Sequence, residues 1–184
     1  MTNLTYKIER KAIHSPAFFQ FATDYYRDVI EKEATLAKIT AEDHILCIGG
    51  GICPFSAILF HQLTDAKVTV VDNNADCIPQ AQQIIEQLGL DEHIHVRLQE
   101  GGSNPCLPYS VIHFALQVTP LAQTFAQVER QATNGTRILL RRPKKQVGSF
   151  YSRLPRSILS RCSYVEHKLP RNIGSTLLYQ KMSA

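Results

Sequence analysis

Apolar and polar positions along the 184-residue chain follow two alternating patterns. Short apolar runs bounded by glycine, proline or polar residues predict strands that are buried on both faces. Longer stretches with apolar residues three and four positions apart predict amphipathic helices. The expected strands cover residues 44–49, 67–72, 93–99, 110–118, 136–142, 163–169 and 175–182, and the expected helices cover 15–40, 54–64, 75–89, 120–132 and 150–161.

The order of these elements predicts the fold class. Strands that alternate with helices build βαβ units, which form a parallel sheet through right-handed crossovers. The last two strands follow each other closely and are expected as an antiparallel pair. We therefore expect an α/β fold with a doubly wound, mostly parallel seven-stranded sheet. In this single domain, residues 1–43 form a short helical N-terminal cap and residues 44–184 form a Rossmann-like core.

Composition excludes several classes of protein. Hydrophobic residues make up 44% of the chain, which is enough for a globular core. No apolar run reaches the length of a membrane span, and charged residues occupy the N-terminus where a signal peptide needs an apolar segment, so we expect a cytoplasmic protein. The five cysteines form no C-x-x-C pair, and we expect neither a disulfide framework nor a metal site.

The net charge of +4 is unevenly distributed. Ten Lys or Arg lie between Arg137 and Arg171, against one acid, Glu166. No aromatic residues in a nucleic-acid-binding pattern accompany them, so the favoured interpretation is a solvated basic face, and a nucleic-acid partner is not expected. Arg141 and Arg142 end the fifth expected strand. Either side chain, if it points inward, could hold a carboxylate of a substrate.

The chemistry concentrates in "HILCIGGGICPFSAILF", residues 44–60, where three glycines end an apolar run. In an open parallel sheet the first strand-to-helix turn forms the base of the ligand crevice. Gly49, Gly50 and Gly51 allow a ligand to approach the backbone, and the next helix offers free N–H groups to an anionic group. Asp72 ends the second expected strand, where an acid accepts hydrogen bonds from ribose hydroxyls.

The same stretch indicates which class of ligand the crevice binds. The phosphate-binding pattern G-x-x-x-x-G-K-[ST] does not occur. The dinucleotide pattern needs glycine at its sixth position, where this chain has Pro54. We therefore favour S-adenosylmethionine over a nicotinamide cofactor.

Residues 47–89, "CIGGGICPFSAILFHQLTDAKVTVVDNNADCIPQAQQIIEQLG", resemble the first half of the class I S-adenosylmethionine-dependent methyltransferase fold, a Rossmann variant. More narrowly, they look like its nicotianamine synthase-like branch. There the first strand lacks the acid common in methyltransferases, as at Cys47, and the glycines lead into a proline-containing helix start, as at Pro54. The segments "GTRILLRR" and "GSTLLYQKM" resemble its fifth and last strands, so the resemblance covers about residues 44–184.

The resemblance implies cofactor contacts beyond the glycine turn. Methyltransferases place an acid or amide after the third strand, near the adenine amino group, where this chain has Gln99 and Glu100. Asn73, next to Asp72, and Leu116, near the end of the fourth expected strand, complete the expected set. His113, inside the fourth strand, is interpreted as a packing residue.

The resemblance also implies an activity. Nicotianamine synthase-like enzymes transfer the 3-amino-3-carboxypropyl arm of S-adenosylmethionine to an amine and release methylthioadenosine. We expect such a transfer to a small amine- or carboxylate-bearing acceptor. A small-molecule methyltransferase and a non-catalytic S-adenosylmethionine-binding protein stay open as alternatives. A homodimer also stays open.

In that branch, tyrosines and a glutamate on an N-terminal helical region build the acceptor side. Here Tyr25, Tyr26, Glu31 and Glu33 lie on such a helix. A carboxylate beside an amine nucleophile could accept its proton. We expect Glu33, rather than Glu31, and Tyr26 to be catalytic, although the mixed charges of "RDVIEKEA" are also typical of a solvated helix face.

Overall fold

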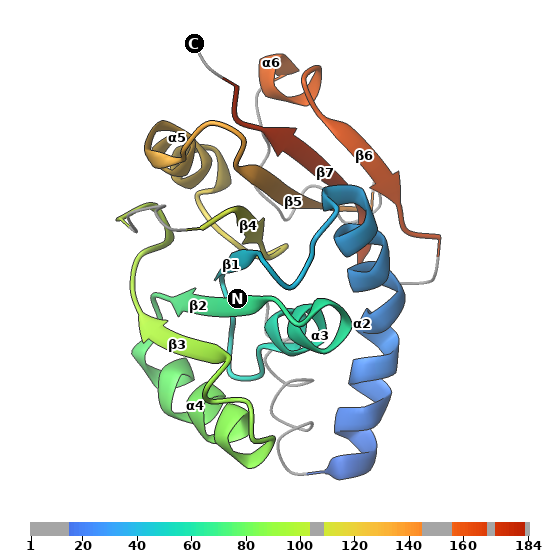
Figure 1. Cartoon of the computed structure of the whole chain (residues 1–184), viewed down its shortest axis with the longest axis vertical. Coiled ribbons are helices and arrows are strands. Elements are labelled where there is room, and N and C mark those ends of the chain that lie inside the picture. Colours follow the sequence, from blue (N-terminus) through green and yellow to red (C-terminus); the bar gives the residue numbers. More distant parts are fainter. Residues whose placement is uncertain (1–14, 104–108, 145–155, 169–171, 183–184) are drawn as a thin grey trace.

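The structure, a computed structural model, describes residues 15–103, 109–144, 156–168 and 172–182. They form a seven-stranded sheet in the order β3-β2-β1-β4-β5-β7-β6 (Figure 1). The strands are β1 (His44–Ile48), β2 (Lys67–Asp72), β3 (Ile94–Leu98), β4 (Val111–Phe114), β5 (Arg137–Pro143), β6 (Ser163–Glu166) and β7 (Ile173–Gln180). The helices are α2 (Pro16–Ala37), α3 (Phe55–Thr64), α4 (Ile78–Gln87), α5 (Leu121–Gln131) and α6 (Arg156–Leu159), with short 3₁₀ turns η1 (Ala75–Cys77) and η2 (Gly101–Ser103).

The strand directions confirm the expected fold class. β1 to β5 pair in parallel, and β7 runs antiparallel to both β5 and β6. The chain is therefore an α/β protein with a doubly wound, mostly parallel sheet. The strand order reverses between β1 and β4, and in such sheets this switch point opens a crevice at the carboxyl ends of the strands.

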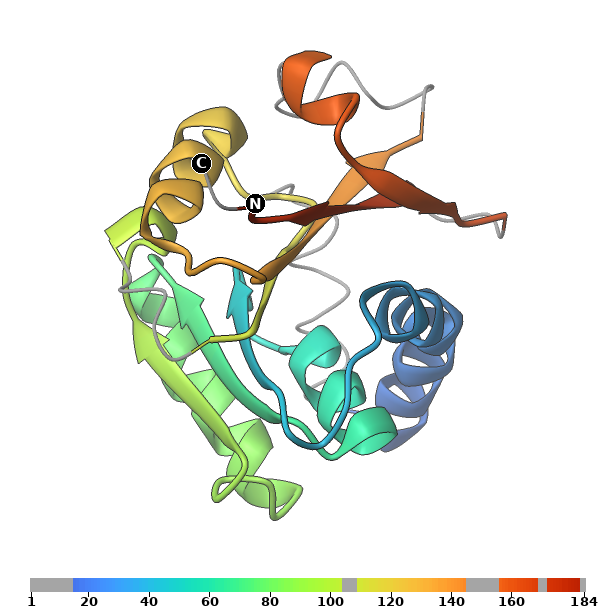
Figure 2. The same ribbon diagram turned by 45° about the horizontal axis from the view of Figure 1, so that its top comes forward.

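Helices cover both faces of the sheet (Figure 2). α2, α3 and α4 share one apolar core with the β1 side chains Ile45 and Cys47, whereas α5 and α6 pack on the opposite face with Leu46 and Ile48. Successive residues of a strand point to opposite faces, so a strand between two helix layers must be apolar throughout. This explains why "HILCI" is a continuous apolar run.

Helix α2 places the N-terminal segment against this layered core. Its buried residues Ala22, Val29, Ile30 and Ala34 recur at helical spacing and face α3 and the sheet. The expected helix at 15–40 is confirmed, while residues 1–14 of the expected cap lie outside the described residues. Of the described helices, none combines the length and apolarity needed to cross a membrane.

Several elements differ in their bounds from the sequence expectation, and the helix expected at 150–161 lies partly outside the described residues. The helix expected at 75–89 begins as η1, because the Asn74 side chain accepts a hydrogen bond from the Asp76 N–H and caps a separate turn before α4. The strand expected at 110–118 ends at Phe114, where the chain leaves the sheet. Only α6 is described of the helix expected at 150–161, because residues 145–155 lie outside the described part.

Candidate active site

A cavity of about 630 Å³ lies at the carboxyl ends of the central strands, a volume typical of small-molecule sites. Its walls come from the turn after β1, the ends of β2, β3 and β4, strand β5 and the inner faces of α2 and α3. All eight expected cofactor residues line it: Gly49, Gly50, Gly51, Asp72, Asn73, Gln99, Glu100 and Leu116. Tyr26 also lines it, whereas Glu33 does not.

The glycine turn requires glycine for two separate reasons. Gly49 and Gly51 have φ values of +86° and +65°, a left-handed conformation that residues with a Cβ rarely adopt. A Cβ at Gly50 would stand 2.2 Å from Val70 Cγ1 on β2. Gly50 is thus needed for packing against the neighbouring strand, and Gly49 and Gly51 for the path of the backbone.

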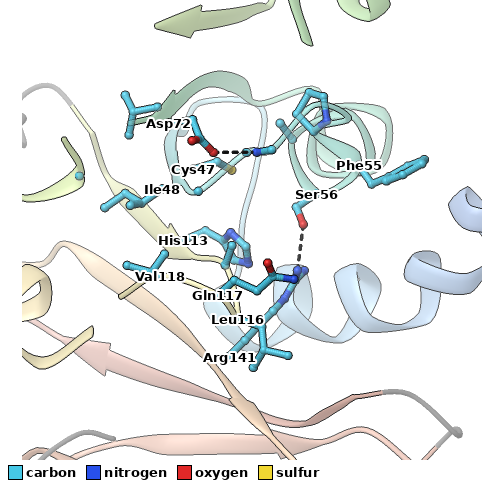
Figure 3. Close-up of a pocket in the computed structure, with 18 of the residues that line it drawn as sticks. Cys47, Ile48, Phe55, Ser56, Asp72, His113, Leu116, Gln117, Val118 and Arg141 are labelled. Atoms are coloured by element: carbon cyan, nitrogen blue, oxygen red, sulfur yellow. Dashed lines mark hydrogen bonds between the residues drawn. The ribbon is translucent and has the colours of Figure 1, made fainter. Parts of the chain in front are cut away.

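Asp72 is fixed to this turn by hydrogen bonds from the backbone. The Gly51 N–H donates to Asp72 Oδ2 at 2.8 Å, and the Asn74 N–H donates to Oδ1 at 3.0 Å. Figure 3 shows the carboxylate at one end of the cavity, beside the turn. Each carboxylate oxygen retains a second acceptor position after these bonds. The acid is therefore held in place and can still accept a bond from a ligand hydroxyl.

Polar groups next to Asp72 extend this end of the cavity. Asn73 Nδ2 donates to Glu100 Oε1 at 3.3 Å, and the Gln99 N–H donates to the Asp72 carbonyl at 2.9 Å. The ends of β2 and β3 are thereby joined at the cavity edge. We call the turn, Asp72 and these neighbours the Asp72 end.

Aromatic side chains from α2 and α3 form the outer wall of the cavity. The Tyr26 ring stacks on Phe55 with centroids 5.7 Å apart, and Tyr25 meets Tyr26 edge to face at 5.1 Å. Phe21, one helical turn before Tyr25, lines the cavity while 63% exposed. This wall offers stacking surface to a planar or apolar part of a ligand.

The opposite end of the cavity contains a buried ion pair. Arg141 Nε and Nη2 each donate to one Glu33 carboxylate oxygen at 2.8 Å, and Arg141 Nη1 donates to Ser56 Oγ at 2.9 Å. Arg141, Ser56 and His113 line the cavity, and we call them the Arg141 end (Figure 3). The two ends therefore differ in charge, with carboxylates at one and a guanidinium at the other.

Glu33 lies behind Arg141 and is fully buried. Thr176 Oγ1 donates to Glu33 Oε1 at 2.6 Å and is itself 2.9 Å from His167 Nε2. The expected solvated helix face is therefore wrong at this position, because α2 turns Glu33 toward the sheet. As placed, Glu33 contacts the guanidinium and not the cavity, so the expected role of a base in contact with the substrate has no geometric support.

Protonation states follow from this burial. Burial alone raises the pKa of Glu33, but the charge and hydrogen bonds of Arg141 outweigh it, so the pKa lies below its ordinary value. Burial, reinforced by the Arg141 charge, lowers the pKa of His113 to about 3. Burial raises the pKa of the Cys47 thiol to about 12. Near neutral pH the pair is ionic, whereas His113 and Cys47 are uncharged.

His113 differs from the packing residue that the sequence predicted. It is buried and its ring meets Phe60 edge to face, as expected of a core residue. However, its Nε2 atom has no hydrogen-bond partner among the described residues. The 3.6 Å from Nε2 to Glu33 Oε2 is too long for a hydrogen bond, and the neutral ring forms no ion pair.

Part of the basic segment is internal rather than solvated. Arg137 donates to the carbonyls of Ala37 and Lys38, at 2.7 and 3.0 Å, and pairs with Asp43. Together with Arg141, it ties β5 to α2 and its following loop, while Arg142 is exposed. Within the described ranges, no group of three or more His, Cys, Asp or Glu could hold a metal ion.

The strand order, antiparallel β7 and crevice define the fold as that of class I S-adenosylmethionine-dependent methyltransferases. No family model matches the sequence, and no curated protein matches it. Its similar solved structures include a glutamate-to-glutamine mutant of MtNAS, a nicotianamine synthase, with a TM-score of 0.80 and 22% identity over 98% of this chain and 72% of that one. The expected fold, in its nicotianamine synthase-like form, is thus confirmed.

Two further structures were solved with ligands. MtNAS in complex with MTA and tNA has a TM-score of 0.78 and 23% identity, covering 97% of this chain and 72% of that chain. An RNA methyltransferase from Salinibacter ruber, in complex with S-adenosyl-L-homocysteine, has a TM-score of 0.69 and 11% identity, covering 85% of this chain and 92% of that chain. At these identities the likeness concerns the fold, and the function has to be argued from the site.

Proposed function

We propose that the chain is an S-adenosylmethionine-dependent transferase. The observation that carries the proposal is the bond from the Gly51 N–H to Asp72 at the edge of a ligand-sized cavity. Two carboxylates at this end, Asp72 and Glu100, can accept hydrogen bonds from ribose hydroxyls and an adenine amino group. The ligands crystallised with MtNAS and with the Salinibacter ruber enzyme support the same cofactor.

For the reaction we propose transfer of the 3-amino-3-carboxypropyl arm to a small acceptor amine. The amine nitrogen attacks the arm carbon bonded to the sulfonium, and the C–S bond breaks with its electron pair left on sulfur. Methylthioadenosine leaves, and the nitrogen loses a proton. The likeness to MtNAS across nearly the whole chain, and its solved complex with MTA, support this reaction over methyl transfer.

Tyr26 and Glu33 receive different roles in this proposal. Tyr26 borders the cavity and is placed to contact the acceptor. Glu33 acts through Arg141, because both of its oxygens are bound by the guanidinium. A cytoplasmic location and a homodimer stay predictions of the sequence, and sedimentation velocity tests the second.

The product of the reaction tests the proposal. The protein is incubated with S-adenosylmethionine and a panel of amines and amino acids, and released nucleosides are separated by chromatography. Methylthioadenosine formed in an acceptor-dependent manner supports aminocarboxypropyl transfer. S-adenosylhomocysteine supports the methyltransferase alternative, and tight cofactor binding without either product supports a non-catalytic binding protein.

A further inference from the structure

The Arg141 end contains three polar groups that the proposed cofactor contacts at the Asp72 end do not use. Arg141, Ser56 and His113 come from β5, α3 and β4 and border the same cavity (Figure 3). His113 Nε2 is a buried nitrogen without a partner among the described residues. Unpartnered buried polar atoms are rare in proteins, and the residue that carries this one lines the cavity beside Arg141.

We propose that Arg141, Ser56 and His113 form a subsite for a carboxylate group, with Glu33 as the positioning residue that holds Arg141 there. The inference rests on the proposed function, because the carboxylate would belong to one of its substrates. It is either the carboxylate of the S-adenosylmethionine arm or that of an amino-acid acceptor.

The hydrogen-bonding chemistry favours an anion. Arg141 is the only Lys or Arg among the described residues that line the cavity. Ser56 Oγ accepts a bond from Arg141 Nη1, so its own hydroxyl hydrogen is left to donate to a ligand oxygen. Neutral His113 can donate from Nε2 in one of its two tautomers. A carboxylate matches these donors, whereas an ammonium group would meet the guanidinium with like charge.

The arrangement of the guanidinium explains how it can serve two carboxylates. Glu33 occupies the edge formed by Nε and Nη2, while Nη1 extends to Ser56 at the cavity. Thr176 holds Glu33 Oε1 from the far side, and His167 contacts Thr176. Elements α2, β5 and β7 therefore fix the plane of the guanidinium, which is the condition for directed recognition of a carboxylate.

Arg141→Lys tests the subsite, because lysine keeps a positive charge beside Glu33 but loses the planar set of donors. Arg142→Lys, at the exposed neighbouring position, is the matched control. Calorimetry compares the wild type and both variants for S-adenosylmethionine and for methylthioadenosine, which lacks the arm and its carboxylate. A third titration uses L-phenylalanine and phenethylamine, which differ by the carboxylate, on the protein saturated with methylthioadenosine.

Two outcomes support the proposal and identify the source. If Arg141→Lys weakens S-adenosylmethionine roughly tenfold or more while methylthioadenosine is unchanged, the carboxylate belongs to the cofactor. If S-adenosylmethionine is unchanged and L-phenylalanine is weakened while phenethylamine is not, it belongs to the acceptor. If Arg141→Lys behaves like Arg142→Lys with every ligand, the subsite does not exist. A wild-type protein that binds neither nucleoside contradicts the proposed function instead.

Glu33→Asp tests the positioning role, since it keeps the charge but withdraws the carboxylate by one methylene. We expect it to weaken the same ligand as Arg141→Lys and to leave methylthioadenosine binding unchanged. A merely structural role of Glu33 would instead weaken all ligands alike, methylthioadenosine included. That result, or no effect on any ligand, would overturn the assignment.

Discussion

The two ends of the cavity are built in different ways. At the Asp72 end, a carboxylate and a backbone N–H only 21 residues apart meet across adjacent strands. At the Arg141 end, side chains 108 residues apart form an ion pair, and a third residue joins it across 143 residues. The first end depends on the backbone path of one βαβ unit, whereas the second depends on the packing of the whole domain.

The difference has energetic consequences. The Asp72 carboxylate borders the open cavity, so losing it affects mainly what the cavity binds. Glu33 and Arg141 are buried, and removing one partner of a buried ion pair leaves an uncompensated charge in a medium of low dielectric constant. We therefore expect substitutions at the Arg141 end to affect stability most, and substitutions at the Asp72 end to affect ligand affinity.

The largest effect is expected for Glu33→Gln. The amide cannot neutralise Arg141, so the free energy of unfolding should fall by about 3–5 kcal/mol in urea denaturation. Glu31→Gln, at an exposed position of the same helix, is the control and should change stability by less than about 0.5 kcal/mol. A stable Glu33→Gln protein that loses only turnover would instead indicate a base in contact with the substrate.

His113 should make the Arg141 end sensitive to acid. Its pKa in the fold is about 3 against 6.5 for the free side chain, so below pH 6.5 the unfolded chain binds a proton that the fold excludes. Stability conferred by the neutral ring is complete above pH 6.5 and declines as the pH falls toward 3, by at most about 1.4 kcal/mol per pH unit. Urea denaturation at a series of pH values measures this slope.

His113→Leu should reduce that slope. Burial also lowers the pKa values of His44 and His167, and both residues are still present in this variant, so part of the acid sensitivity remains. An identical slope in wild type and His113→Leu would mean that His113 accepts its proton in the fold.

The site residues that the sequence could predict lie mainly at the Asp72 end, and those that it could not lie mainly at the Arg141 end. The glycine turn and Asp72 can be predicted because each lies at the end of a recognisable strand, and their spacing is that of one βαβ unit. Tyr26 was expected from the resemblance to the nicotianamine synthase-like branch, in which tyrosines of an N-terminal helical region build the acceptor side. These features are local, so a pattern along the chain is enough to place them at one cavity.

The position of Arg141 at the end of the fifth expected strand indicated a possible carboxylate contact, but nothing local predicts its ion pair with Glu33. "EKEA" looks solvated, and only the docking of α2 on β5 turns Glu33 inward. No sequence pattern indicated a role for Thr176 or His167, because a hydroxyl or imidazole group in an expected strand has no typical hydrogen-bond partner. For Ser56 the sequence offered a weak indication, because its hydroxyl lies in the first turn of the helix that follows the glycines. The segment with Arg137 and Arg141 was interpreted as a solvated face because ion pairs across about a hundred residues are not visible in composition.

Asp72→Ala should lower affinity at the other end without a comparable loss of stability. Removing a carboxylate that accepts from ligand hydroxyls should cost about 1–3 kcal/mol of S-adenosylmethionine binding in calorimetry. Asp76→Ala, which removes an exposed acid four residues further on, is the control. Unchanged affinity in Asp72→Ala would contradict the cofactor site, whereas a loss of stability equal to that of Glu33→Gln would remove the distinction between the two ends.

The smallest effect is expected at the edge of the Asp72 end, where Asn73 and Glu100 are both exposed and Asn73 Nδ2 donates to Glu100 Oε1 at 3.3 Å and to Oε2 at 3.5 Å. Exposed contacts to a charged group contribute little, so Asn73→Ala should weaken S-adenosylmethionine binding by less than about 1 kcal/mol. If the amide acts only by orienting Glu100, Asn73→Ala should have no further effect in a Glu100→Ala background. An equal loss in both backgrounds would show that Asn73 contacts the cofactor itself.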